Sequence, residues 1–404
     1  MNHDILKAPT KEEALAGLFA AWTPAPVTEE VPLAESLGRV AACDITAVLM
    51  MPLGPISKMD GYAVKSQNFA NGTPDPTLWV RGTDYVVADT GDDVPDAYDT
   101  VIEVEKLYPD AKGKLMFDPA FVFKQGGNIM PPGCRVMPGD LLCRKNTRIT
   151  PEIKVNLALG GVYTVPVIKK AVVAFIPTGN ELVPVGQVPQ RGETPETNSM
   201  MTADYLRQWG AEPMLLPIVR DDRKALDAAI RNALERADIV LINGGTSKGS
   251  EDFNAGLVEE TATYFAHSVR TVPGRPVGIG LIGGKPVIDV PGPIWAAWTV
   301  NDWLVRAMVC RWLGLPMEAR RTVEAELTID RPRRPDSEQF LHCELLRKGG
   351  KLTVTPLEKR SRTSVQLLDG TGLLIGPLGH CGWKAGDTVT VELTTPEECI
   401  RTEE

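Results

Sequence analysis

The spacing of apolar positions divides the chain into stretches of different periodicity. Between residues 171 and 313, continuous apolar runs alternate with stretches whose apolar residues recur at helical spacing. The apolar runs predict strands at 171–176, 215–219, 239–242 and 287–290. The amphipathic stretches predict helices at 198–209, 222–236, 253–261 and 294–313. Because alternating strands and helices connect through right-handed crossovers, this region predicts a mostly parallel sheet covered on both faces.

The segments on either side have the pattern of β-structure. Short apolar runs broken by Gly, Pro and Asp fill residues 46–148 and predict strands at 78–80, 101–104, 121–123 and 141–143. After residue 319 the runs predict a small β-barrel or sandwich, with a hairpin signal at Lys348-Gly349-Gly350-Lys351. Near the start, Thr10 and Glu13 have the spacing of a capping box, which predicts a helix through Trp22.

Length and charge narrow the class of protein. A chain of 404 residues is too long for one ordinary core, so we expect several domains. The formal net charge of −9 argues against a large basic face for nucleic acid but permits a local anion pocket. No window approaches the ~20 apolar residues of a membrane-spanning helix, and the amino end lacks the regions of a signal peptide. We therefore expect a cytoplasmic protein with no nucleic-acid or membrane partner.

The cysteines and histidines give no site of their own. The seven cysteines are scattered and include no Cys-x-x-Cys pair, which favours a reduced compartment. The pairs His342-Cys343 and His380-Cys381 match no common zinc module. Only four histidines are present and no nucleophile triad stands out, so His-based acid–base catalysis is not expected.

Three glycine-containing loops follow predicted strands, at 177–181, 243–252 and 291–293. Open parallel sheets bind ligands at the carboxyl ends of their strands, where helix amino termini offer free N–H groups. In the middle loop, paired glycines allow close backbone approach, Lys248 and two hydroxyls can hold an anion, and Asp252 can ligate a cation. These features predict a phosphate-bearing ligand with a divalent metal. The alternative is that the loops only turn the chain.

Other patterns predict structure rather than chemistry. The Gly278–Gly283 run matches G-x-G-x-x-G, but a strand follows it, so we expect a hairpin turn and no dinucleotide site. Glu103 and Glu105 alternate with apolar residues and are expected on one face of a strand. The tryptophans between 294 and 313 are expected to pack in the core.

Several short motifs occur in a defined order along the chain. They are Met59-Asp60-Gly61-Tyr62-Ala63-Val64, Thr90-Gly91 with 99–105, Gly127-Asn128-Ile129, Gly139-Asp140, Thr178-Gly179-Asn180-Glu181-Leu182, Thr197-Asn198-Ser199, and Gly244-Gly245-Thr246-Ser247 with Asp252-Phe253. Any one is weak, but the ordered set is specific and spans essentially the whole chain. The set resembles the MoeA family of molybdopterin molybdenumtransferases, which are related to the gephyrin E domain.

The resemblance implies a multidomain fold of α/β and β type and an elongated cytoplasmic homodimer. It implies four domains: a discontinuous stem of helix and strands (1–45 plus 149–170), a β-rich inserted domain (46–148), a MogA-like three-layer α/β domain that binds molybdopterin (171–318), and a C-terminal β-barrel (319–404). The implied partners are a MogA-type adenylyltransferase and acceptor molybdoenzymes, both in transient contact.

The reaction implied by the resemblance is a step of molybdenum cofactor biosynthesis. Adenylylated molybdopterin is hydrolysed with Mg²⁺, and molybdate is inserted into the dithiolene. Carboxylates would hold Mg²⁺ near the pyrophosphate, while N–H groups and hydroxyls would hold the pterin phosphate.

Residue by residue, the resemblance implies roles for acidic and anion-binding positions. The implied catalytic residues are Asp60, Glu181 and Asp252. The implied metal ligands are Glu105, Glu181 and Asp252. The implied cofactor-binding residues are Thr178, Gly179, Asn198, Ser199, Gly244, Gly245, Thr246, Ser247, Lys248, Arg275, Pro291 and Gly292.

The chain also departs from the family pattern. The departures are Arg135 in place of an Asp, Asn180 in Thr-Gly-Asn-Glu, Arg275 in Val-Pro-Gly-Arg, Pro293 in place of an Asn, and His342 in place of an Arg. They keep an alternative open, namely a carrier, sensor or scaffold that binds molybdopterin without turnover. Adenylylation of molybdopterin, as in MogA, is disfavoured because it would leave 1–170 and 319–404 unneeded.

Overall fold

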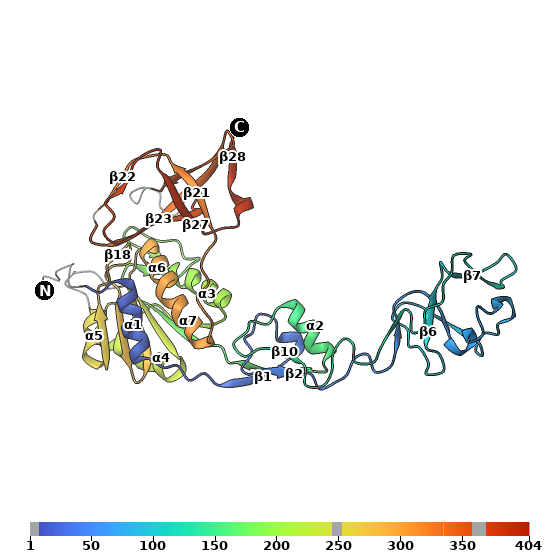
Figure 1. Ribbon diagram of the computed structural model, residues 1–404. Coiled ribbons are helices and arrows are strands. Elements are labelled where there is room, and N and C mark those ends of the chain that lie inside the picture. Colours follow the sequence, from blue (N-terminus) through green and yellow to red (C-terminus); the bar gives the residue numbers. More distant parts are fainter. Residues whose placement is uncertain (1–7, 245–252, 334, 358–368, 404) are drawn as a thin grey trace. The chain divides into compact units, whose positions relative to one another are not determined.

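The computed structural model describes residues 8–244, 253–333, 335–357 and 369–403. The chain forms two compact units (Figure 1). One unit combines the residues up to 27 with residues 169–404, and the other comprises residues 28–168. Among the helices of the described residues, none is long and apolar enough to cross a membrane.

A six-stranded sheet with the order β15-β12-β16-β20-β19-β17 lies in the first unit. The parallel strands are β15 (Glu212–Leu215), β12 (Val172–Pro177), β16 (Ile239–Asn243) and β20 (Lys285–Val290). The antiparallel strands are β19 (Gly278–Ile282) and β17 (Tyr264–His267). The prediction of a mostly parallel sheet is confirmed. The strand predicted at 215–219 lies earlier in the chain, as β15. This edge strand is half-exposed, so it has no continuous apolar run that marks its position.

Helices cover both faces of this sheet. They are α3 (Asn198–Trp209), α4 (Arg223–Arg236), α5 (Phe253–Thr261), α6 (Ile294–Val300) and α7 (Arg306–Leu313), with a π-helical turn at Asn301–Val305. Leu226 and Ile230 of α4 join Ala174 and Ile176 of β12 in one core. Phe175, which alternates with those two strand residues, is buried on the other face, where α3 contacts β12. The predicted helices are therefore confirmed.

Local sequence explains where these elements begin and end. The Asp222 carboxylate accepts a hydrogen bond of 2.8 Å from Ala225 N and so caps α4. Helix α3 ends at Gly210, whose φ of +100° suits a residue without a side chain. The Gly283-Gly284 turn joins β19 to β20, which confirms the predicted hairpin at the G-x-G-x-x-G run.

Helix α1 (Lys11–Ala21) begins with the predicted capping box, in which Thr10 and Glu13 bond each other's backbone N–H. It contacts β17 and β19 of the six-stranded sheet. A Cβ at Gly17 would lie 2.5 Å from the Tyr264 hydroxyl, so a side chain there would have to displace the Tyr264 ring. The predicted assignment of residues 1–45 to the stem is therefore wrong for this helix, which belongs to the unit that contains the sheet.

The carboxyl-terminal part of the first unit is a closed barrel. Its strands β23, β24, β21, β27 and β25 pair in sequence, and β25 pairs back to β23. Their bounds are β21 (Thr322–Leu327), β23 (Glu338–Lys348), β24 (Lys351–Pro356), β25 (Gly372–Gly376) and β27 (Thr388–Leu393). Shorter strands are β18 (Thr271–Val272), β22 (Arg331–Pro332), β26 (Gly382–Trp383) and β28 (Arg401–Glu403). Pairing of β18 with β23 joins the barrel to the α/β region, and the predicted hairpin at Gly349-Gly350 is confirmed.

The second unit has three hydrophobic clusters, one outside the β-rich insertion and two within it. Strands β1 (Thr28–Pro32) and β11 (Thr164–Ile168), β2 (Ile45–Thr46) and β10 (Leu141–Cys143), and helix α2 (Pro151–Leu159) share the first. The β-rich insertion contains β3 (Ile56–Ser57), β4 (Gly61–Val64), β5 (Tyr85–Ala88), β6 (Thr100–Glu103), β7 (Leu107–Pro109), β8 (Leu115–Phe117) and β9 (Ile129–Met130).

Three predictions for the insertion are corrected. Residues 78–80 are not a strand, because a 3₁₀ turn at Pro76–Leu78 occupies part of the segment. Residues 121–123 are irregular, and Phe123 stacks on Phe69 with ring centroids 3.8 Å apart. Strand β10, placed by prediction in the insertion, pairs instead with β2, and Cys143 lies in the cluster outside the insertion. The apolar residues of the segments at 78–80 and 121–123 serve packing rather than a strand, and those at 141–143 form a strand that pairs outside the insertion.

Candidate functional site

A cavity of about 310 Å³ opens at the carboxyl ends of β12, β16 and β20. Its described lining is Thr178, Glu181, Leu182, Thr194, Pro195, Glu196, Thr197, Asn198, Asn243, Gly244, Gly292, Pro293 and Ile294. The three loops expected at one edge of the sheet each contribute to this lining. No tryptophan is among these lining residues.

Gly244 sets how closely the first two loops approach. Its φ is +130°, and a Cβ there would lie 2.3 Å from the Thr178 carbonyl oxygen. Thr178 N also donates to Asn243 O at 2.8 Å. A side chain at residue 244 would therefore force the loops after β12 and β16 apart.

A buried asparagine pair fixes the rim on the β20 side. The Asn243 amide donates to Val290 O at 3.2 Å and to Pro291 O at 3.0 Å. Asn198, at the start of α3, donates to Asn243 Oδ1 at 3.0 Å and to Gly292 O at 2.7 Å. The Asn198 amide hydrogens are thus used within the protein, so this side chain holds the cavity wall in place.

Asn254 of α5 is a site residue that sequence reasoning missed. Its amide donates to Gly244 O at 2.5 Å and to Asp289 Oδ1 at 3.2 Å. Asn254 and Asp289 are both buried. The available signal in the sequence was Asn254, two positions after Asp252, together with Asp289, which interrupts the apolar run 287–290.

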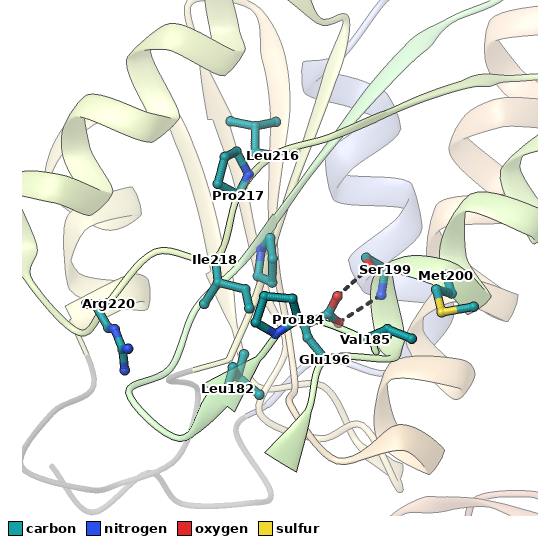
Figure 2. A pocket seen from close by; sticks show the side chains of 11 residues that line it. Leu182, Pro184, Val185, Glu196, Ser199, Met200, Leu216, Pro217, Ile218 and Arg220 are labelled. Atoms are coloured by element: carbon teal, nitrogen blue, oxygen red, sulfur yellow. Dashed lines mark hydrogen bonds between the residues drawn. The ribbon is translucent and has the colours of Figure 1, made fainter. Parts of the chain in front are cut away.

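Glu196 is a second missed residue. Glu196 is 7% exposed, and its carboxylate accepts hydrogen bonds from Ser199 N at 2.9 Å and from the Ser199 hydroxyl. These bonds use the Ser199 donors that the resemblance assigned to a cofactor. Ser199 lines a neighbouring cavity rather than the rim cavity, and Figure 2 shows its two bonds to Glu196.

Glu181 is the exposed carboxylate of the rim cavity. Gly179 lies under it: a Cβ there would be 2.7 Å from Glu181 Oε2. The loop is held from outside by Asp221, whose carboxylate accepts from Asn180 N at 3.1 Å, and by Arg220, whose Nη1 donates to Asn180 O at 2.5 Å.

The donors of the cavity suit a hard cation. The described lining offers carboxylate, hydroxyl, amide and carbonyl oxygens and contains neither thiol nor imidazole. Such a set matches Mg²⁺ better than Zn²⁺. Within the residues that the structure describes, no group of three or more His, Cys, Asp or Glu side chains could by itself hold a metal ion.

The described lining of this cavity does not account for every predicted site residue. Gly245, Thr246, Ser247, Lys248 and Asp252 lie outside the described residues. Arg275 follows β18, and its carbonyl accepts from Val269 N at 2.9 Å, but its side chain is not part of the described lining.

Two predicted acidic residues, Asp60 and Glu105, belong to the second unit. The Asp60 carboxylate accepts from Thr90 N at 2.7 Å and from Thr90 Oγ1 at 2.8 Å. These bonds, the backbone one first, lower the pKa of Asp60 below its ordinary value. Strand β6 ends at Glu103, so Glu105 lies in the following turn and the two glutamates do not share a strand face as predicted. Val104 N donates to Asp60 O at 3.0 Å, which brings the two turns together.

The tryptophans of helices α6 and α7 and the π-turn act mainly in packing. Trp298 and Trp303 are 7% and 2% exposed, as predicted. Trp298 packs with Phe340 of the barrel and donates to the Tyr205 hydroxyl at 2.9 Å. His342 lies against Trp295, with ring centroids 3.8 Å apart. This cluster joins α6 to the barrel.

Comparison with known proteins identifies related sequences and structures. Residues 10–160 match the family described as the MoeA N-terminal region (domain I and II), and residues 174–310 match the probable molybdopterin binding domain. A molybdopterin molybdenumtransferase of Bacillus subtilis (strain 168) is 28% identical over 389 residues, 92% of this chain and 90% of that protein. One of Staphylococcus aureus (strain COL) is 25% identical over 382 residues, covering 90% of each.

Two solved structures are similar to this chain over nearly its full length. A crystal structure of a molybdopterin biosynthesis MoeA protein from Pyrococcus horikoshii has a TM-score of 0.79 and 28% identity. The two structures superpose over 96% of this chain and 100% of the Pyrococcus chain. A second structure from that organism has a TM-score of 0.73 and 25% identity, with the same coverage.

Proposed function

The chain belongs to the MoeA family as a divergent member, and from this premise we propose that it acts in molybdenum cofactor biosynthesis as a molybdopterin molybdenumtransferase. Its substrates are adenylylated molybdopterin and molybdate. It hydrolyses the adenylate and transfers molybdenum to the dithiolene.

The rim cavity is the observation that carries this proposal. Its backbone can approach a phosphate closely because Gly244 and Gly292 have no side chains, and Thr197 adds a hydroxyl. The Thr178 hydroxyl donates to Asn243 O at 3.3 Å and so belongs to the wall. Such backbone-lined concavities at the carboxyl ends of parallel strands suit anions. We assign the molybdopterin phosphate to this cavity.

Side chains of the rim would hold the pyrophosphate whose P–O bond breaks. Asn198 and Asn243 hold the β16 and β20 ends of the rim together, so bound phosphate meets a rigid wall. Glu181 would hold Mg²⁺ together with Asp252, and Asp60 and Glu105 are the further acidic candidates. When bound, Mg²⁺ neutralises charge on the pyrophosphate and stabilises the leaving phosphate.

The remaining family properties are part of the same proposal. We assign to the protein a homodimeric state, a cytoplasmic location, and transient contact with a MogA-type adenylyltransferase and with acceptor molybdoenzymes. Sedimentation of the full chain tests the homodimer directly.

The test of function is incubation of the purified protein with adenylylated molybdopterin, Mg²⁺ and molybdate. We expect release of AMP and formation of molybdenum cofactor, and we expect Asp252→Ala to abolish AMP release. Circular dichroism of that variant checks that it is folded. Tight binding of the substrate without AMP release would contradict the transferase and identify a carrier.

A further inference from the structure

A cavity of about 390 Å³ lies in the β-rich insertion, beside strand β6. The turn that contains Gly127 and Asn128 forms another part of its wall. Val101 N of β6 donates to Gly127 O at 2.9 Å, and the Asn128 side-chain amide donates to Val101 O at 3.1 Å, so this turn is fixed to the strand. Asp60 and Glu105, the acidic residues to which the sequence assigned a role in this unit, are not in the described lining.

The lining carries an excess of positive charge. Three lysines, Lys58, Lys106 and Lys124, line the cavity together with one carboxylate, that of Glu103. Among the described residues, Lys58 and Lys124 form no ion pair, and Lys106 Nζ lies 3.9 Å from Asp118 Oδ1. The chain has 52 acidic and 43 basic residues, so carboxylate partners are in excess. Because like charges around one hollow repel each other, this arrangement favours a bound anion.

Other polar groups of the wall already have partners within the protein. The Thr100 hydroxyl accepts from Gly126 N at 3.0 Å. The Asn128 amide, besides its bond to strand β6, donates to Glu103 Oε2 at 3.3 Å. The lysine ammonium groups therefore remain for a ligand, and they donate hydrogen bonds but cannot accept them. A ligand of this cavity must offer acceptor oxygens and negative charge.

Part of the lining is apolar. Phe121 and Val122 contribute to it. Val122 is 84% exposed, whereas the Phe121 ring stacks on Phe117 with centroids 4.4 Å apart. Small-molecule sites typically combine an apolar wall with a few polar groups in a volume of about 300–1,000 Å³. The cavity therefore suits a small anion that also has an apolar body.

We propose that this cavity binds a small organic dianion, a phosphate monoester or a dicarboxylate, that carries an apolar or aromatic body. The lysine ammonium groups act as point charges, which suit phosphate and carboxylate oxygens alike. Phe121 and Val122 contact the apolar body. The site is additional to the rim cavity and independent of the proposed function, since all of its described lining belongs to the second unit.

The test is equilibrium binding to the full-length protein at neutral pH. The probes are phenyl phosphate and phthalate, one for each class of dianion, with benzyl alcohol as the uncharged counterpart. We expect Lys58→Gln and Lys124→Gln each to weaken a bound dianion at least about fivefold, and Lys112→Gln to change it less than about twofold. Lys112 is the matched control, because it is an exposed lysine of the same insertion outside the described lining.

Three further variants separate a charge effect from a folding defect. Glu103→Gln removes the carboxylate of the lining, so we expect the dianions to bind about twofold tighter or more, which loss of structure would not produce. Lys124→Arg keeps the charge and should retain binding within about twofold. Val122→Ser should weaken phenyl phosphate but leave the affinity for inorganic phosphate unchanged, because only the aromatic body contacts Val122.

Hydrogen–deuterium exchange shows where the probe binds, since the rim cavity is also proposed to hold a phosphate. We expect phenyl phosphate to slow exchange in peptides covering 100–106 and 121–128. Four results would overturn the inference: no binding of either dianion at millimolar concentration, slower exchange confined to 178–182 and 291–294, benzyl alcohol binding as tightly as the dianions, or weaker binding in Glu103→Gln. Equal losses in Lys112→Gln and Lys124→Gln would also overturn it.

Discussion

Replacement of Gly244 by alanine tests the geometry of the rim cavity. The new Cβ would lie 2.3 Å from the Thr178 carbonyl oxygen and 2.6 Å from Thr178 Oγ1. It would also sit on a backbone with φ of +130°, which side chains rarely adopt. The contact with the Thr178 carbonyl oxygen cannot be relieved by rotation of a side chain, because that atom belongs to the backbone.

Two effects set the expected loss of stability. Strain of a non-glycine residue in a sparsely populated backbone region costs about 1–3 kcal/mol, and overpacking a close contact costs a further ~1–3 kcal/mol. We therefore expect Gly244→Ala to lower the free energy of unfolding by about 2–4 kcal/mol, allowing for some relaxation. Gly292→Ala is the matched control, since its Cβ would meet only Gly244 Cα, at 3.8 Å.

Urea unfolding followed by tryptophan fluorescence measures the difference. Of the eight tryptophans only Trp79 lies in residues 28–168, so the signal reports mainly on the unit that contains the sheet. We expect the free energy of unfolding to fall by about 2–4 kcal/mol for Gly244→Ala and to change by less than about 0.5 kcal/mol for Gly292→Ala. Equal stability of the two variants would refute the close approach of the loops at Gly244.

Four further changes have defined outcomes. Glu181→Gln should leave stability within about 0.5 kcal/mol, because the side chain is exposed, yet abolish Mg²⁺-dependent AMP release; normal release would remove Glu181 from the mechanism. Asn243→Ala should cost about 2–3 kcal/mol in urea unfolding, because buried carbonyl groups lose their donor; a neutral result would refute the asparagine clamp. Thr10→Ala should lower stability by about 1 kcal/mol through loss of the capping box, and helix α1 then frays first in hydrogen exchange. Burial raises the pKa of Cys343 to about 12, so its contribution to stability is complete below the unfolded thiol pKa of about 8.5 and is lost as pH rises toward 12; rapid labelling of Cys343 in native protein at pH 8 would contradict this.

Much of the fold followed from periodicity. The strands at β12, β16 and β20 are buried on both faces and therefore appear as continuous apolar runs. Edge strands do not have this pattern, which is why the predicted bounds of β15 were wrong. The placement of helix α1 against β17 and β19 depends on packing between distant segments, for which the local sequence has no signal.

The site was predictable in its position but not in its bonding. Strand ends followed by glycine-containing loops located Thr178, Gly244 and Gly292 at one cavity. The roles of Glu196 and Asn254 depend on partners three and ten residues away, in arrangements that only the folded chain determines. Sequence reasoning assigned Ser199 and Asn198 to a ligand, whereas the structure uses their donors in the wall.

The claim that the substrate occupies the rim cavity is tested most directly by hydrogen–deuterium exchange of the full-length protein, with and without adenylylated molybdopterin and Mg²⁺. We predict slower exchange in peptides covering 178–182, 194–198 and 291–294. Slower exchange confined to the barrel, with these three segments unchanged at saturating substrate, would contradict it.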